Sequence, residues 1–455
     1  MKAASYSIKY CAGLFIVSAL LCSILCYPQT FPDAQGTVFT LPQCIEYALK
    51  NQPFVKQSKL DESITRKNIL ISLSGWFPQL NLDADLRHNF QLPTSFFPNL
   101  NDPAGPQTEV TTGLINTSTA DFSANQAIYS TDLVFAGKTV KNLRLRALQN
   151  TENSEINSVA EVSKSFYDVM LTIEQLGLWN EEIQRLERNQ EDAFHLYKSG
   201  LTDKIDYQQA LIAVNNAKAQ KRITEEAIKG KYAILKQSMG FPAAQPLSVL
   251  YDSTSFEKEI LTDTLKVFSY NNRIEYRMLQ TDMQLQNAQT GYYRWSFLPL
   301  ISAFYDYNLN YFNDSFSPLF NTSYPNSLIG IKLTLPLFRG TSRWQNLQKS
   351  RLQYQRLQIG QDYLSSQFNT QYTQALGNYK GNLNALRIAK ENISIAQGVF
   401  NTIAIQYNQG IKTYLNLIVA ETDLRSAKLN YISTLFQVLS SKLDLKVAMG
   451  NITVN

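Results

Sequence analysis

The sequence has few side chains of the types that bind metal ions or act as nucleophiles. Its 455 residues include two histidines, His88 and His195, and four cysteines. Two histidines leave little scope for His-based metal sites or His-dependent nucleophilic catalysis, and four cysteines leave little scope for a disulfide framework. No glycine-rich phosphate loop or nucleophile motif is present. The sequence therefore predicts a protein that is not an enzyme and has no cofactor or metal site, and both histidines are expected to be ordinary surface residues.

Charged residues are the remaining candidates for chemistry. Neighbouring carboxylates such as Glu181–Glu182 and Glu191–Asp192 lie in stretches of helical pattern, and we expect them on solvated helix faces. The formal net charge of +5 is too small to indicate a nucleic-acid partner. Charged residues make up 17% of the chain, against about 25% in soluble domains. The mean hydropathy of −0.22 nevertheless argues against a polytopic helical membrane protein.

The N-terminus is typical of a secretory signal peptide. Lys2 and Lys9 precede an uncharged, largely apolar run from Tyr10 to Leu25. We assign the signal to residues 1–26, with cleavage between residues 23 and 36. A membrane anchor is the alternative, but the run is slightly short for a spanning helix and no basic segment follows it.

Removing the signal would leave one cysteine. Cys11, Cys22 and Cys26 would be lost, so Cys44 would have no partner for an internal disulfide. Cys22 and Cys26 both follow leucine, which disfavours a lipid anchor. Cys44 lies on an apparent helix face and is expected to be a small buried apolar residue.

The mature chain contains one unit twice. The segment YKSGLTDKIDYQQALIAVNNAKAQ begins at Tyr197, and the similar segment YNQGIKTYLNLIVAETDLRSAKLN begins 210 residues later at Tyr407. The same offset pairs Gly240 with Gly450. Upstream, Phe135 pairs with Phe338 at an offset of 203. We therefore divide the chain into a first repeat at 37–240, a linker at 241–261 and a second repeat at 262–450.

Each repeat predicts a helix, two strands, a long helix, a turn and a returning helix. Leu80, Leu82, Ala84 and Leu86 alternate with polar residues, as in a half-buried strand. A strand of a soluble sandwich would look similar, but the aromatic, proline-rich loops between strands favour a membrane. The predicted strands are 79–92, 118–130, 297–312 and 326–338. One helix is predicted from about residue 40 to 74, long proline-free helices at 136–197 and 341–407, and returning helices at 201–240 and 411–450.

Four strands are too few to close a membrane barrel, which needs at least eight. Chains would therefore have to pool their strands, and three chains would give twelve. The helix at 341–407 would be roughly 100 Å long at 1.5 Å per residue, much longer than a globular helix. The sequence thus predicts an α+β membrane protein with four transmembrane strands and a long helical body.

With these features in place, the chain resembles the TolC family of outer-membrane efflux and secretion channels. The most specific stretches are LTLPLFRGTSRWQNLQKSR and YNQGIKTYLNLIVAETDLRSAKLNYISTLFQVLSSKLDLKVAMG. The resemblance implies a homotrimer whose twelve-stranded barrel lies in outer-membrane lipid and continues into a coiled-coil α-helical tunnel, with most of the mass in the periplasm. It also implies a periplasmic adaptor (a membrane fusion protein) and an inner-membrane pump of RND or ABC type.

The same resemblance assigns the functional residues. Two hairpin tips would face the adaptor, and they comprise Tyr197, Gly200, Leu201, Thr202, Tyr407, Gly410, Ile411 and Lys412. Leu201, Thr202, Ile411 and Lys412 are expected to be exposed. The periplasmic entrance constriction would be formed by Asp203, Asp206, Asn416 and Val419. Many members carry aspartates six and nine residues after the second turn glycine, where this chain has Asn416 and Val419. The alternative is that Asp203 and Asp206 are merely helix-start residues that the macrodipole favours.

The resulting prediction is a passive exit duct of a tripartite efflux or type I secretion system. One alternative is a duct dedicated to protein secretion instead of small-molecule efflux, which the gene neighbourhood would distinguish. The other is a periplasmic structural coiled-coil or adaptor protein, which would lack membrane strands; the alternation at 80–87 and 329–335 argues against it.

Overall fold

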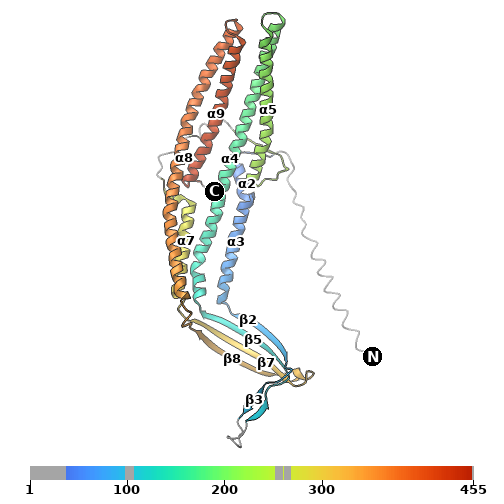
Figure 1. The fold of residues 1–455 in the computed structure, drawn as a ribbon, viewed down its shortest axis with the longest axis vertical. Coiled ribbons are helices and arrows are strands. Elements are labelled where there is room, and N and C mark those ends of the chain that lie inside the picture. Colours follow the sequence, from blue (N-terminus) through green and yellow to red (C-terminus); the bar gives the residue numbers. More distant parts are fainter. Residues whose placement is uncertain (1–36, 98–106, 252–259, 261–267, 453–455) are drawn as a thin grey trace, which may run out of the picture.

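The computed structural model describes residues 37–97, 107–251, 260 and 268–452. The predicted signal peptide at 1–26 and part of the predicted linker lie outside these residues. The molecule is long and narrow, with a four-stranded sheet near one end and two helical hairpins at the other (Figure 1). The fold is therefore an elongated α+β arrangement.

Long helices form most of the described structure. They are α2 (Leu41–Asn51), α3 (Pro53–Leu73), α4 (Thr131–Lys198), α5 (Lys204–Met239), α7 (Ile274–Trp295), α8 (Ser342–Asn408) and α9 (Tyr414–Ala448), with short 3-10 turns at Ser74–Trp76, Tyr270–Asn272 and Leu319–Asn321. The ends of the four longest differ from the predicted ends by up to five residues. The expectation of one helix from 40 to 74 was wrong: Pro53 starts a new helix, and the Gln52 side chain caps it by accepting from the Val55 N–H at 2.9 Å. Within the described residues no helix combines the length and apolarity needed to cross a membrane.

The main sheet has four antiparallel strands in the order β2-β5-β7-β8. They are β2 (Gln79–His88), β5 (Asn116–Tyr129), β7 (Leu300–Asn313) and β8 (Tyr324–Thr334). The strand predicted at 326–338 ends at Thr334, two residues before Pro336, which cannot donate to a ladder. Two small sheets were not predicted. They are the antiparallel pair β3 (Thr94–Phe97) and β4 (Thr108–Thr111), and the parallel pair β1 (Thr37–Phe39) and β6 (Leu247–Val249), the latter strand lying in the predicted linker.

The register of the main sheet collects apolar side chains on one face. Directly paired residues point to the same side, and Leu82 pairs with Phe122, which pairs with Tyr307. We call this side the apolar face; it carries Leu80, Leu82, Leu86, Phe122, Tyr305, Tyr307, Leu309, Ile329, Ile331 and Leu333. The opposite face is mostly polar, with rows such as Asp83, Asp121 and Asn308, although it also carries Phe304 and Leu328. The alternation seen in single strands therefore extends across all four.

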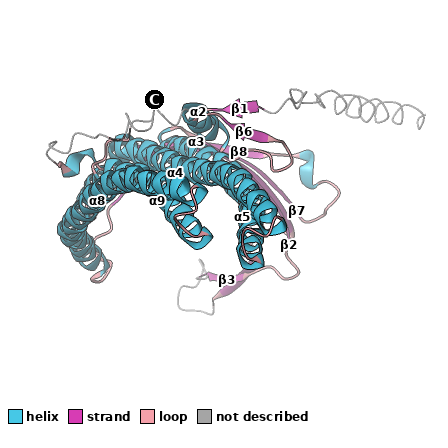
Figure 2. Cartoon of the chain, turned by 90° about the horizontal axis from the view of Figure 1, so that it is seen from above, coloured by secondary structure: helices cyan, strands magenta, loops and turns pink. Residues whose placement is uncertain are grey.

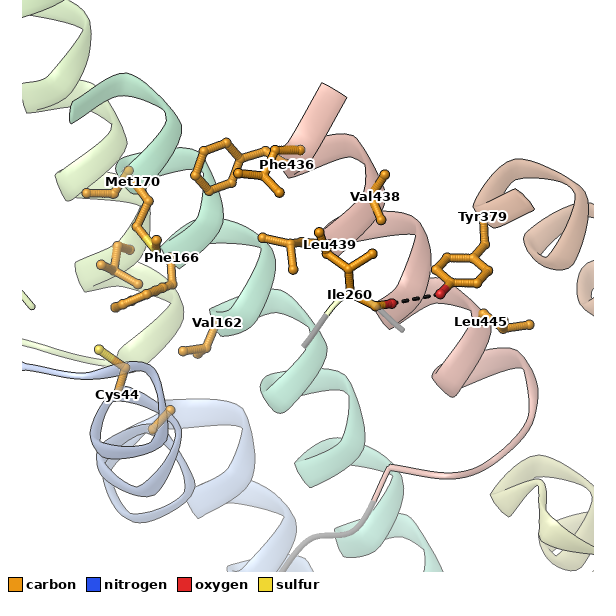
Figure 3. Packing of buried hydrophobic residues seen from close by; sticks show 14 of the residues in the cluster. Cys44, Val162, Phe166, Met170, Ile260, Tyr379, Phe436, Val438, Leu439 and Leu445 are labelled. Carbon is orange, nitrogen blue, oxygen red and sulfur yellow. Dashed lines mark hydrogen bonds between the residues drawn. The ribbon is translucent and has the colours of Figure 1, made fainter. Parts of the chain in front are cut away.

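The helices continue the order of the strands. α3 contacts α4, α4 contacts α7, and α7 contacts α8, matching the order β2-β5-β7-β8. Beyond them α4 pairs with α5 and α8 with α9, forming two hairpins. Seen from above, the helices form a curved layer (Figure 2). The main apolar core lies between α2, α4 and α9, and Figure 3 shows Cys44, Phe166 and Leu439 within it. Cys44 is buried, as predicted.

One packing arrangement occurs in both halves. Gly240 and Gly450 follow the two returning helices with φ of 67° and 68°, a left-handed conformation that suits glycine. A Cβ on Gly240 would lie 2.7 Å from the carbonyl oxygen of Asn51, and one on Gly450 would lie 2.6 Å from that of Asn272. Each returning helix thus ends in close contact with the start of the helix that leads into the strands.

Candidate functional site

The two hairpin turns have the same backbone structure. Gly200 and Gly410 adopt φ of 75° and 73°, and each N–H donates to the carbonyl three residues earlier, that of Tyr197 or Tyr407. The residue after each glycine donates its N–H to the carbonyl five residues earlier, at 2.9 and 2.8 Å. This pair of hydrogen bonds is a helix C-terminal motif in which the glycine has a left-handed backbone conformation. The similar sequences at the two positions therefore form turns of the same structure.

Large apolar side chains project at these turns. Leu201 is 72% exposed and Ile411 is 66% exposed, and Lys412 is also exposed, as expected. Thr202 departs from the expectation, since it is half-buried and its hydroxyl has no hydrogen-bond partner among the described residues. The two hairpins therefore expose a leucine and an isoleucine at equivalent positions, each directly after the turn glycine.

The four predicted entrance residues lie at the starts of α5 and α9. Asp203 caps α5 by accepting from the Ile205 N–H at 3.4 Å, and Asp206 is in the first turn. The Asn416 side-chain oxygen accepts from the Thr413 N–H at 3.2 Å and hydroxyl at 2.9 Å in a capping box. Asp203 and Asn416 therefore act as helix-start residues, the alternative interpretation for the aspartate. Val419 is exposed.

The hairpins contact one another below their turns. Ala193 and Ala210 of the first hairpin form a buried cluster with Tyr414 and Leu417 of the second. Burial raises the pKa of Tyr407, and the negative charge of Asp206 raises it further. The charge of Asp206 at the start of α5 thus acts on Tyr407 at the end of α8, although the two residues are about 200 positions apart in sequence.

Deeper in the contact, an ionic cluster joins α4 to α9. It consists of Glu182 and Arg185 from α4 with Glu421 and Arg425 from α9. Arg185 contacts Glu182 and donates from Nε to Glu421 at 2.7 Å, while Arg425 donates to Glu182 at 3.0 Å. Asn189 completes the site by donating to Glu421 at 3.1 Å. The side chains of Glu182 and Glu421 are only 2% and 1% exposed.

Burial and ion pairing shift the pKa values of this cluster in opposite directions. Burial raises the pKa of Glu421, while the hydrogen bond and charge of Arg185 act in the opposite direction. Burial alone would lower the pKa of Arg185, but Glu182 and Glu421 more than offset this and raise it. Buried ion pairs of this kind hold a specific geometry, because an unpaired buried charge is strongly unfavourable.

This cluster corrects one sequence prediction. Glu182 was expected on a solvated face, whereas it is buried against the second hairpin. Glu421, Arg185 and Arg425 were not singled out from the sequence. Acid and base spaced by three or four residues are common on exposed helices, so the spacing alone could not identify them. A groove of about 350 Å³ between α5 and α9 opens beside the cluster, and Arg425, Ile212 and Leu415 line it.

No metal centre is evident in the described parts of the chain. They hold no group of three or more His, Cys, Asp or Glu side chains that could bind a metal ion. His88 Nδ1 lies 2.8 Å from the side-chain oxygen of Asn116, and His195 is an exposed residue near the end of α4, as expected.

The chain thus combines a sheet with one apolar face, helices that run on from its strands, and two similar hairpin tips. The comparisons with known proteins assign this combination to the outer-membrane channels. A family model described as outer membrane efflux protein matches residues 44–240 and 271–451. The chain therefore belongs to the outer membrane efflux protein family and is an outer-membrane protein. The resemblance and location predicted from the sequence are confirmed.

Individual relatives agree with this assignment. The outer membrane protein TolC of Vibrio cholerae serotype O1 is 21% identical over 428 residues, covering 91% of this chain and 91% of the relative. TolC of Salmonella enteritidis is 18% identical over 421 residues, which cover 90% of this chain and 82% of the relative. Among solved structures, CusC superposes with a TM-score of 0.72 at 16% identity, over 92% of this chain and 95% of CusC. The Campylobacter jejuni CmeC outer membrane channel superposes with a TM-score of 0.70 at 14% identity, over 90% of this chain and 85% of CmeC.

Proposed function

We propose that the protein is the passive outer-membrane exit duct of a tripartite efflux or type I secretion system, formed by three copies of the chain. The observation that carries the proposal is the main sheet: one face is apolar across four strands, and β2 and β8 are its two edges. Open edges in lipid leave backbone groups unsatisfied at a cost of several kcal/mol each. Joining β8 of one copy to β2 of the next in a ring of three gives twelve strands and no edge.

The helical body is proposed to form the periplasmic tunnel. α4 and α8 run from the sheet to the hairpin tips, so they would extend most of the protein's mass away from the membrane. The tips would dock a periplasmic adaptor, which links the duct to an inner-membrane pump. Exposed Leu201 and Ile411, together with Lys412, supply the apolar contacts and charge for that docking.

The entrance would be polar but only weakly negative. Asp203 and Asp206 contribute carboxylates from α5, whereas α9 offers Asn416 and Val419. A ring of three carboxylates attracts cations and repels itself, so fewer such rings weaken both cation block and charge-dependent opening. Substrates would pass by diffusion once the pump has delivered them. Selectivity would therefore rest mainly with the pump.

Cell fractionation with cross-linking tests the proposal. We expect the mature protein in the outer-membrane fraction, with increasing amounts of a lysine-reactive cross-linker giving dimer and then trimer but no larger species. A periplasmic structural protein would instead be recovered in the soluble fraction. Recovery of a soluble monomer at all cross-linker concentrations would overturn the trimeric duct.

A further inference from the structure

A second groove, of about 660 Å³, opens where the strands give way to the helices. It lies between α4 and α7, and its lining combines two cations with several aromatic rings. The lining residues that matter here are Tyr129, Lys138, Arg294 and Trp295. Nothing in the duct proposal uses this groove.

The groove continues the apolar face of the sheet. Tyr129, at the end of β5, pairs with Ile301, and Ile301 pairs with Leu333 on β8. A register shift between Ala127 and Tyr129 interrupts the alternation of β5, and the pairing with Ile301 places Tyr129 on the side of the sheet that carries the apolar face. α4 and α7 are also the inner two of the four helices that run on from the strands, so the groove lies away from the edges where another copy would pair.

The two cations of the groove are exposed to solvent. Within the described residues neither Lys138 nor Arg294 forms an ion pair. Two ion pairs in the described part of the chain join α4 to α7, Arg146–Asp282 and Glu152–Arg277, and both lie at least two helical turns further from the sheet. Asp132, at the start of α4, accepts a hydrogen bond from the Tyr292 hydroxyl at 2.7 Å.

We propose that this groove binds the phosphate headgroup of an anionic glycerophospholipid in the leaflet nearest the helices. The inference rests on the proposed function, because the apolar face must lie in a bilayer. Lys138 and Arg294 donate to the phosphate, a charge-assisted contact for which both side chains are suited. Trp295 is 52% exposed and lies with Tyr129 at the level where aromatic rings anchor proteins at membrane interfaces.

The test measures lipid binding to the full-length mature protein in detergent by native mass spectrometry. The probe is phosphatidylglycerol, with phosphatidylcholine as the neutral comparison. The double variant Lys138→Ala/Arg294→Ala is expected to bind phosphatidylglycerol about thirtyfold more weakly, since each basic residue contributes about 1 kcal/mol at an anionic surface. The matched control is Lys141→Ala, which removes an exposed lysine of the same helix that does not line the groove, and it should bind like wild type.

The outcomes separate this site from the duct proposal. A membrane-embedded trimer whose double variant binds phosphatidylglycerol as tightly as the Lys141→Ala control would overturn the lipid site alone. Equal affinity of the wild type for the neutral and anionic lipids would do the same. A wild-type chain that is soluble, monomeric and free of lipid would overturn the duct and the lipid site together.

Discussion

The ionic cluster between α4 and α9 allows a quantitative test of how the two hairpins are held together. Replacing Arg185 by methionine keeps an unbranched stem and removes the guanidinium that contacts both buried glutamates. Among the described contacts, Glu421 would then keep the Asn189 amide at 3.1 Å, and Glu182 would keep Arg425 at 3.0 Å. Each carboxylate would remain buried with one hydrogen-bonding partner instead of two.

The expected loss follows from the burial of those carboxylates. Removing one partner of a buried ion pair costs about 3–5 kcal/mol, because the other charge stays desolvated. The side chain of Arg185 is itself 23% exposed, so water can partly replace it, and we expect the lower end, about 3 kcal/mol. Adding Glu421→Gln removes one stranded charge and should recover about 2 kcal/mol of that loss.

The assay is denaturant unfolding of the purified protein, followed by the circular dichroism of its helices. Both single variants and the double variant form a double-mutant cycle, from which the coupling energy between Arg185 and Glu421 is obtained. The matched control is Arg188→Met, one turn along the exposed side of α4, whose Nε donates to a backbone carbonyl at 3.2 Å. It should change the unfolding free energy by about 0.5 kcal/mol or less.

The pH dependence gives the same test a second readout. Burial raises the pKa of Glu421, so folding favours its protonated form, and the stability this provides is complete below the ordinary value of 4.5. That contribution is lost as the pH rises through the raised pKa. Arg185→Met removes a cation and raises the pKa of Glu421 further, so its cost should be largest at neutral pH and shrink towards pH 4.5. A cost below about 1 kcal/mol at neutral pH, without coupling, would refute the role of the cluster.

Three further predictions concern other parts of the chain. Burial raises the pKa of Cys44 to about 12, so iodoacetamide at pH 8 should modify it only on unfolding; rapid labelling of folded protein, detected by mass spectrometry, would contradict its burial. Gly450→Ala should lower the unfolding free energy by about 1–3 kcal/mol, because its Cβ would meet Asn272, whereas Gly377→Ala, in open helix, should not. Asn416→Asp keeps an oxygen that accepts both cap hydrogen bonds, so the variant changes the charge alone. We expect lower single-channel conductance at negative lumen bias or stronger block by divalent cations. No change in either would show that residue 416 does not line the constriction.

Much of the fold could be predicted because its signals are local. Alternating residues indicated β2, β7 and β8 of the main sheet, and the repeated glycines Gly200 and Gly410 indicated both turns. The break before Pro53 was missed because the helical pattern continues on both sides of it. β1 and β6 were missed because they are three residues each and pair across the whole first repeat. Such pairings depend on tertiary contacts that periodicity does not report.

The site was only partly predictable for a similar reason. The turn residues follow from the repeat, and the capping role of Asp203 is a local property of its helix start. Burial of Glu182 and Glu421 depends on which faces of α4 and α9 meet, and each sequence looks like an ordinary charged helix. The apolar face likewise required the register, because a shift of one residue would reverse every side chain of a strand.

The number of chains in the membrane-extracted protein tests the central claim most directly. Native mass spectrometry of the mature protein, released from outer membranes in mild detergent, should give the mass of three chains, since three sets of the four strands β2, β5, β7 and β8 make one closed ring. A mass of one chain would leave the edges of the sheet unpaired in lipid. That result, or any stable assembly other than a trimer, would contradict the account.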